Sequence, residues 1–186
     1  MILIVNCGSS KTPYIEEAVD AVCDFETISF FDLTEKKAKE FSGIIFSGAP
    51  LLITEIDIEP YLQHVEWIKN YGKPILGICF GHQLLGLLHG SRGSRMREDR
   101  DWQEIEVFVD SPLFDKLPSV FEMMEDHCES ISIAKDFLLV ASSDACVNES
   151  MQHVSKPFYG VQFHPEVSGN FGQILIENFI KITLPK

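Results

Sequence analysis

Short β-type runs alternate with segments of helical periodicity through the first half of the chain. The runs that predict buried strands are residues 2–5, 25–31, 43–47 and 75–78. The segments that predict helices are residues 13–23, 60–71 and 82–88. Strands that alternate with helices form parallel sheets, because each crossover helix covers one face of the sheet. The alternation therefore predicts an α/β fold with a doubly wound, mostly parallel sheet of the flavodoxin type.

The second half of the chain has the pattern of antiparallel strands. Residues 104–109 alternate between apolar and charged side chains, and further β-type runs occupy residues 121–124, 137–141 and 158–163. A last helix is predicted over residues 170–182. We interpret the mixed-charge stretch 92–101 as a solvated hairpin, with a docking surface for a partner enzyme as the alternative. We expect an antiparallel extension of the sheet, and residues 1–186 to form one domain.

Composition excludes several classes of function. The chain has 15 Lys and Arg against 28 Asp and Glu, a net charge of −13 in 186 residues, so neither nucleic acid nor an anionic membrane is expected as a partner. The five cysteines are widely spaced and form no CxxC pair, which predicts a reducing, cytoplasmic compartment and no zinc ribbon. The apolar run at the start has five residues, too few for a signal peptide or a membrane span.

Cys79 has the sequence context of a nucleophile. It lies between a predicted strand and a predicted helix, with Gly77 and Gly81 two residues to either side. This is the nucleophile-elbow pattern with cysteine in place of serine, in which glycines leave room for a sharp turn. A helix N-terminus also favours the thiolate form of a cysteine. The alternative is a buried structural cysteine, which is common after a strand.

A histidine and two small residues are placed to complete such a site. His164 directly follows the strand predicted over 158–163, and Glu166 can turn back across Pro165 to accept a hydrogen bond from the ring. Gly48 and Ala49 also follow a predicted strand. Small residues there allow backbone N–H groups to approach a developing oxyanion, although an ordinary turn gives the same pattern.

These paired motifs resemble those of the class I, or triad, glutamine amidotransferases. The segments that carry the resemblance are Gly77-Ile-Cys-Phe-Gly-His-Gln83 and Tyr159-Gly-Val-Gln-Phe-His-Pro-Glu-Val167, and the likeness extends along nearly the whole chain. Within the family, Ile44–Gly48, Met124–His127 and the His-Pro-Glu-Val wording are most similar to the glutaminase subunits of GMP synthetases. The elbow segment is also similar to that of the small subunit of carbamoyl-phosphate synthetase.

The resemblance implies a role for each matching residue. Cys79 matches the nucleophile, His164 the general base and acid, and Glu166 the residue that orients it. The N–H groups of Phe80 and of the Gly48–Ala49 turn match the oxyanion hole. The residues that match the glutamine-binding positions are Gln83, Asp126, His127, Cys128 and Glu129, the last four through their backbone. The resemblance implies neither a metal ion nor a cofactor for this chemistry.

The implied substrate is L-glutamine, and the implied partner is a separate ATP-dependent synthetase subunit that accepts ammonia, with GMP synthesis as the expected use. Two alternatives stay open: a free-standing γ-glutamyl hydrolase, and a weakly catalytic regulatory binding protein of the same fold. The chain departs from the family pattern at Ala49, where a second glycine is usual. It departs again at Asp126–Glu129, where the usual wording is Ser-His-Gly-Asp or Ser-His-Met-Asp and this chain has Asp-His-Cys-Glu.

Overall fold

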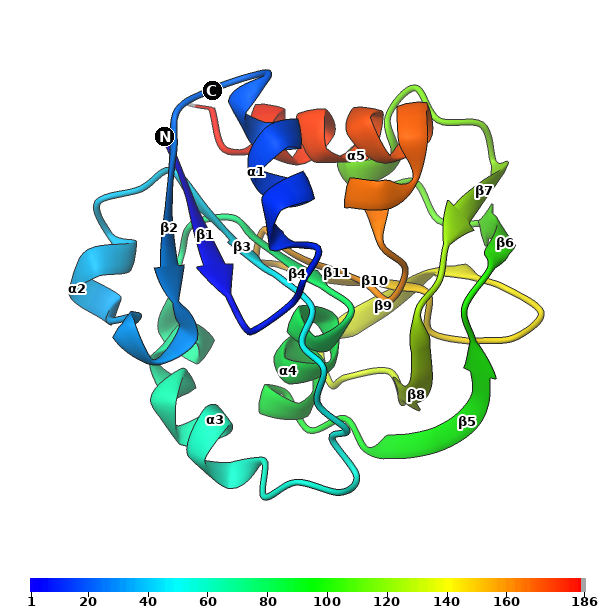
Figure 1. Cartoon of the computed structure of the whole chain (residues 1–186), viewed down its shortest axis with the longest axis horizontal. Helices are drawn as coiled ribbons and strands as arrows, with labels where there is room; N and C mark the ends of the chain where they lie inside the picture. The colour runs from blue at the N-terminus through cyan, green and yellow to red at the C-terminus, as the bar shows by residue number, and fades with distance from the viewer. Residues whose placement is uncertain (185–186) are drawn as a thin grey trace.

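Five parallel strands form one half of the main sheet in the computed structural model, which describes residues 1–184 (Figure 1). They are β1 (Ile2–Asn6), β2 (Phe25–Ser29), β3 (Gly43–Phe46), β4 (Ile75–Ile78) and β11 (Phe158–Val161). Their order is β2-β1-β3-β4-β11, which is the order of flavodoxin-like sheets. The last of them, β11, pairs with β4 in a register that places Gly160 beside Gly77. The predicted parallel sheet is therefore confirmed.

Helices cover both faces of these strands. On one face pack α1 (Thr12–Asp20) and α5 (Gly169–Ile182), and on the other α2 (Glu35–Ala38), α3 (Glu59–His64) and α4 (Phe80–Leu88) (Figure 1). The side chains of β1 alternate between the two cores, with Ile2 and Ile4 toward α1 and α5 and with Leu3 and Val5 toward α4. Within residues 1–184, no helix is both long and apolar enough to cross a bilayer.

The helix predicted over residues 60–71 is interrupted in the structure. After α3, Val65 has a φ of −111° and a ψ of 13°, and a 3₁₀-helix then covers Glu66–Asn70. The buried side chains of this region are spaced three residues apart, at Val65, Ile68 and Tyr71. That spacing matches the three residues per turn of a 3₁₀-helix better than the 3.6 of an α-helix. The prediction of one continuous α-helix was therefore wrong.

Antiparallel strands extend the sheet beyond β11, as predicted. In order from β11 they are β10 (Ser150–His153), β9 (Phe137–Ser142), β6 (Trp102–Val107) and β7 (Val120–Met124). A separate ribbon consists of β5 (Gly93–Asp99) and β8 (His127–Ile131). The hairpin predicted over residues 92–101 was wrong, because β5 pairs with β8, the third strand after it, and not with its neighbour along the chain.

The carboxyl ends of β3, β4 and β11 meet at one edge of the sheet. The three strands are adjacent and parallel, so the segments that follow them lie side by side. In flavodoxin-like sheets this edge is where ligands bind. The fold thus brings together Gly48, Cys79 and His164, which are far apart in the sequence.

Candidate active site

Cys79 occupies a strained turn between β4 and α4. Its φ is 52° and its ψ is −104°, and residues other than glycine rarely have a positive φ. Two backbone hydrogen bonds hold the turn. The N–H of Cys79 donates to the carbonyl of Val161 at 2.8 Å, and the N–H of Gln83 donates to the carbonyl of Cys79 at 3.0 Å. A strained strand-to-helix turn of this kind presents a nucleophile above the edge of the sheet.

The two glycines of the elbow are needed for close packing. A Cβ atom on Gly77 would lie 2.4 Å from the carbonyl oxygen of Gly81, and a Cβ atom on Gly81 would lie 2.6 Å from the carbonyl oxygen of Phe46. Neither glycine has a positive φ; within the turn it is Cys79 that does. The glycines therefore let α4 lie directly against β3 and β4, while the cysteine carries the backbone strain.

His164 and Glu166 form a buried pair at the end of β11. The Nδ1 atom of His164 lies 2.7 Å from Oε1 of Glu166, and the two side chains are 3% and 0% exposed. The backbone of His164 is also fixed, since its N–H donates to the carbonyl of Met124 at 2.9 Å and its carbonyl accepts from Ser168 Oγ at 2.6 Å. With Nδ1 held by Glu166, the Nε2 atom of His164 is the nitrogen left for a reacting group.

Electrostatics in the site favour a charged His164. Burial lowers the pKa of His164, but the charge and hydrogen bond of Cys79, together with those of Glu166, outweigh this effect and raise that pKa to about 10. At neutral pH the arrangement therefore favours an imidazolium on His164, beside the sulfur of Cys79. A thiolate is the nucleophilic form of cysteine, and the imidazolium can donate a proton.

The turn after β3 lies against both of these side chains. A Cβ atom on Gly48 would be 3.2 Å from Cε1 of His164 and 3.6 Å from Cβ of Cys79. The turn is held by Ser47, whose Oγ accepts from the N–H of Cys7 at 2.9 Å and donates to the carbonyl of Gly48 at 2.9 Å. The next residue, Ala49, lines the adjoining cavity, so the turn forms one wall of the site.

The N-terminus of α4 forms a neighbouring wall. Phe80 is the first residue of this helix, and the N–H groups of a first helical turn have no acceptor within the helix. The helix dipole adds partial positive charge at the same point. Backbone N–H groups here and in the Ala49 turn are thus positioned at the site where an oxyanion would need donors.

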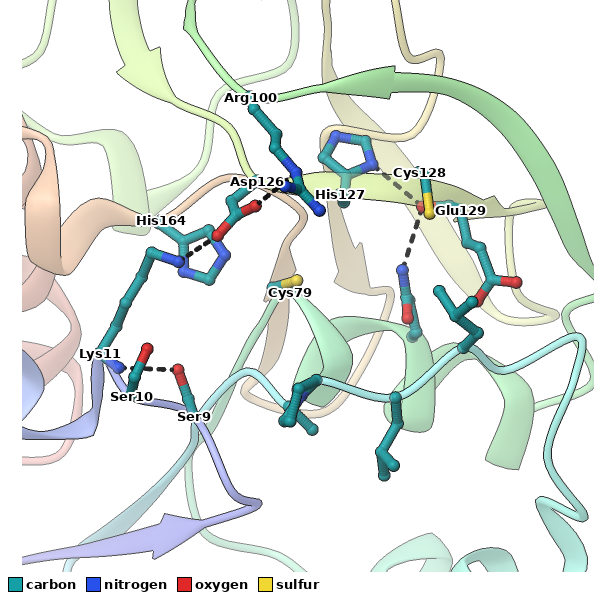
Figure 2. A pocket seen from close by; sticks show the side chains of 15 residues that line it. Ser9, Ser10, Lys11, Cys79, Arg100, Asp126, His127, Cys128, Glu129 and His164 are labelled. Atoms are coloured by element: carbon teal, nitrogen blue, oxygen red, sulfur yellow. Dashed lines mark hydrogen bonds and ion pairs between the residues drawn. The ribbon is translucent and has the colours of Figure 1, made fainter.

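A cavity of about 320 Å³ opens at this edge of the sheet. Figure 2 shows the sulfur of Cys79 near the middle of the cavity, with His164 on one side and Cys128 and Glu129 on the other. The predicted site residues that line it are Ala49, Cys79, Gln83, Asp126, His127, Cys128, Glu129 and His164. The residues that the sequence analysis did not select are Ser9, Ser10, Lys11, Pro50, Leu51, Leu52 and Arg100.

The wall opposite His164 is a network of side chains that bond to one another. Gln83 Nε2 donates to the carbonyl of Glu129 and to Oε1 of Gln162, both at 3.1 Å. The carboxylate of Glu129 accepts from the N–H groups of Ile53 and Thr54 at 2.5 and 3.2 Å. Gln83 and the Glu129 side chain therefore hold the cavity wall together, and Glu129 fixes the loop after Ala49 to β8.

Charged side chains surround the mouth of the cavity. Asp126 pairs with Lys11, and its Oδ1 atom lies 3.3 Å from Nε of Arg100 (Figure 2). Burial raises the pKa of Asp126, but the hydrogen bond and charge of Lys11, with smaller effects from His164 and Arg100, outweigh it and keep that pKa below its usual range. Sequence reasoning had no signal for Lys11 or Arg100, because they lie in segments with no recognisable motif.

Gln162 is a further residue beside the nucleophile. Its Nε2 atom lies 3.6 Å from the sulfur of Cys79 and donates toward it, and its side chain is fully buried. Gln162 precedes His164 by two residues in the Val-Gln-Phe-His motif. Alternation along an extended segment directs residues i and i+2 to the same side, so this spacing could have indicated that Gln162 faces the site with His164.

Comparison with known proteins assigns the family. Residues 3–182 match the family model described as "Glutamine amidotransferase class-I". The chain belongs to this family. The resemblance found in the sequence motifs is therefore confirmed over nearly the whole chain, and with it the fold expected for a class I glutamine amidotransferase.

Among individual relatives, proteins named as GMP synthases are similar to this chain. A glutamine-hydrolyzing GMP synthase subunit of Pyrococcus furiosus is 39% identical over 153 residues, which cover 81% of this chain and 80% of that protein. The glutamine-hydrolyzing GMP synthase of Yersinia enterocolitica is 34% identical over 193 aligned positions, covering 96% of this chain but only 36% of that protein. The amidotransferase fold thus occurs in relatives both in a separate subunit of the enzyme and within a longer chain.

A solved structure agrees with these relatives. The crystal structure of a putative GMP synthase subunit from Thermoplasma acidophilum superposes with a TM-score of 0.87 at 28% identity, covering 98% of this chain and 94% of that one. A glutamine amidotransferase structure from Thermotoga maritima has a TM-score of 0.77 at 20% identity, a likeness that concerns the fold alone. Both the parallel sheet and its antiparallel extension are therefore shared with solved family members.

Proposed function

We propose that this protein hydrolyses L-glutamine to glutamate and ammonia through Cys79, His164 and Glu166, and that a separate synthetase uses the ammonia to make GMP. The observation that carries the proposal is the strained Cys79 elbow facing a buried His164–Glu166 pair. Family membership supports glutamine as the substrate, and the relatives named as GMP synthase subunits support the use of the ammonia.

The first half of the reaction breaks the carbon–nitrogen bond of the side-chain amide. The Cys79 thiolate attacks the amide carbon and forms a tetrahedral oxyanion. As this intermediate collapses, the His164 imidazolium transfers its proton to the departing NH₂ group, which leaves as ammonia. The product on the enzyme is a γ-glutamyl thioester with Cys79, and His164 is now neutral.

The second half of the reaction restores the resting enzyme. Neutral His164 takes a proton from water, and the resulting hydroxide attacks the thioester carbon. The carbon–sulfur bond breaks, glutamate leaves, and the thiolate–imidazolium pair forms again. In both halves the N–H groups of Phe80 and Ala49 are placed to stabilise the oxyanion. Glu166 keeps the His164 ring oriented and stabilises its charged form throughout.

The cavity suits a small zwitterion. Its volume of about 320 Å³ is at the small end for ligand sites. Charged side chains of both signs lie at its mouth, where Asp126 pairs with Lys11 and with Arg100. An amino acid with its α-ammonium and α-carboxylate groups at the mouth would extend its side-chain amide inward to Cys79.

The proposed partner is an ATP-dependent synthetase subunit, and the proposed compartment is the cytoplasm. The archaeal relatives named as GMP synthase subunits match this chain over 75–80% of their own length, which favours a two-subunit enzyme. All five cysteines are free in the structure, as proteins of a reducing compartment require.

The test is a glutaminase assay of the full chain, alone and with a GMP synthase synthetase subunit supplied with ATP and its nucleotide substrate. We expect ammonia release from L-glutamine that rises at least tenfold with the loaded partner. High activity on γ-glutamyl peptides without any partner would instead support the hydrolase alternative. Glutamine binding without turnover under every condition would support the regulatory alternative.

A further inference from the structure

Three buried ligand-type side chains lie together behind the cavity wall. They are Glu125 in the turn between β7 and β8, His127 at the start of β8, and Glu149 just before β10. Their exposed fractions are 1%, 7% and 0%. One oxygen or nitrogen atom from each lies within 4.8 Å of the others. The proposed glutamine chemistry assigns no role to either carboxylate.

The hydrogen bonds of the cluster leave one possible ligand atom free on His127 and one on Glu149. His127 Nδ1 lies 3.0 Å from the carbonyl oxygen of Glu129, and that contact requires the ring to donate from Nδ1. In a neutral ring, the Nε2 atom then presents its lone pair to the cluster. Glu149 accepts from Ser143 Oγ through Oε1 at 2.6 Å, so its Oε2 atom is the free one. Neither His127 Nε2 nor Glu149 Oε2 has a hydrogen-bond partner within residues 1–184.

The contact between His127 and Glu125 points to a cation between them. His127 Nε2 lies 3.0 Å from Glu125 Oε2, yet within the described chain neither atom makes an aligned hydrogen bond. Two lone pairs that face each other at this distance repel unless a proton or a metal ion binds them both. Two ligands of one tetrahedral zinc ion, each at about 2.0–2.2 Å, would be about 3.3–3.6 Å apart, so a small displacement of either side chain would let the two atoms share an ion.

The two buried carboxylates of the cluster would also be stabilised by a cation. Among the ion pairs of residues 1–184, neither Glu125 nor Glu149 meets a lysine or an arginine. Burying carboxylates without a counter-charge is costly. Consistent with this cost, burial raises the pKa of Glu125 to about 8 and that of Glu149 well above its usual value, with further contributions from their neighbours.

We infer that Glu125, His127 and Glu149 form a binding site for a divalent transition-metal ion of the zinc class. One imidazole and two carboxylates are a donor set that such ions accept. The outer contacts agree with this, because metal-bound histidines usually donate their second ring nitrogen to a carbonyl, and metal-bound carboxylates usually accept an outer hydrogen bond. Here those partners are Glu129 and Ser143.

The role of such an ion would be structural. It would join the β7–β8 turn to the segment before β10, which are distant in the sequence. Cys128 and Glu129, which line the cavity, directly follow His127. The ion would therefore fix the wall of the active site without touching the reacting atoms, and the inference does not depend on the proposed reaction.

Zinc binding by the full chain tests the inference. The experiment uses a Cys79→Ala background, so that the active-site thiol cannot bind the ion. Protein treated with chelator and dialysed is titrated with ZnCl₂, and bound zinc and Tm are measured. We expect one zinc ion per chain and a Tm that rises by several degrees with zinc. Glu149→Gln and Glu125→Gln should weaken binding by roughly 10–100-fold or more, whereas exposed Glu104→Gln should not.

Two results would overturn the inference. The first is a Cys79→Ala protein that binds no zinc in the titration, with no change in Tm. The carboxylates would then share a proton, and Glu149→Gln would leave the stability equal or higher. The second is zinc bound as tightly by Glu149→Gln and Glu125→Gln as by the parent, which would place the ion elsewhere. Because two carboxylates are substituted separately, the location of the ion is tested even if one of the two variants fails to fold.

Discussion

The two halves of the sheet hold their functional groups by different means. In the parallel half, Gly48, Cys79 and His164 stand at strand ends, and backbone hydrogen bonds and glycine packing set their positions. In the antiparallel half and its ribbon, buried polar groups are held by hydrogen bonds of side chains: the Glu129 carboxylate accepts from the hydroxyl and N–H of Thr54, and the Glu129 carbonyl accepts from the Gln83 side chain. The parallel half therefore positions the reacting atoms, and the antiparallel half with its ribbon forms the cavity wall that would contact the substrate.

This difference predicts how the two halves respond to substitution. Groups that the backbone places can lose their chemistry while the fold persists, because their own side chains contribute little to the core. Groups within a buried polar network stabilise the fold through their hydrogen bonds, and their loss leaves partners without a bond. We therefore expect substitutions of functional groups in the parallel half to lower activity and to leave stability unchanged. Substitutions in the antiparallel half should change both activity and stability.

The largest effect is expected for Cys79→Ala. Loss of the nucleophile should reduce the turnover of L-glutamine by at least roughly 10⁴-fold, with little change in the free energy of unfolding. The matched control is Cys146→Ala, the same chemical change at a buried cysteine of the antiparallel half. That variant should keep its activity within a few fold. Equal losses in the two variants, measured by ammonia release and denaturant titration, would contradict the comparison.

A pair of substitutions at the turn after β3 is expected to have the next largest effect. Gly48→Ala would place a Cβ atom 3.2 Å from Cε1 of His164, and we expect kcat to fall by about 10- to 100-fold, the range of one misplaced catalytic group. Ala49 has no positive φ, so Ala49→Gly should change kcat by only a few fold and lower stability by about 0.5–1 kcal/mol. Steady-state kinetics of both variants decides whether Gly48 or Ala49 is the sensitive position.

A smaller effect, visible in the pH profile, is expected for Glu166→Gln. The pKa of His164 is raised above its usual value, in part by the charge of Glu166. The imidazolium is present below that pKa and is lost as the pH rises through it. Removing the charge lowers the pKa, so the alkaline limb of kcat/KM should move to lower pH. An alkaline limb that stays in place, or moves to higher pH, would show that Glu166 does not stabilise the imidazolium.

The smallest effect on turnover is expected in the antiparallel half, for Glu129→Gln. This change removes the charge that accepts from the N–H groups of Ile53 and Thr54. We expect the free energy of unfolding to fall by about 1–3 kcal/mol and KM to rise, with kcat within a few fold. Exposed Glu122→Gln serves as the control. A loss of kcat with full stability would place Glu129 among the reacting groups, against the comparison.

The parallel half was predictable because its strands are buried on both faces. Residues 2–5 and 75–78 read as uninterrupted apolar runs, and the glycines around Cys79 mark the turn that follows. The same features made Cys79, His164 and Glu166 predictable as a site, since Cys79 directly follows β4, His164 lies three residues after β11, and Glu166 lies two residues after His164. The interrupted helix at Val65 was not predictable, because apolar residues spaced by three also fit an α-helix over so short a segment.

The antiparallel half was only partly predictable because its buried positions are often polar. The inward residues of β8 are His127, Glu129 and Ile131, so the apolar alternation that marks a strand is missing. β10 is also polar, and β5 is charged on both faces. The pairing of Asp126 with Lys11 and Arg100 joins three distant segments, which no local pattern specifies.

The central claim is that Cys79 is the nucleophile that takes up the γ-glutamyl group. The most direct measurement is intact-protein and peptide mass spectrometry after reaction with a diazoketone analogue of glutamine. We predict one adduct per chain, on Cys79 alone, formed more slowly in the presence of excess L-glutamine and absent in Cys79→Ala. Unmodified protein, or adducts spread over Cys7 and Cys128 with no protection by glutamine, would contradict the claim.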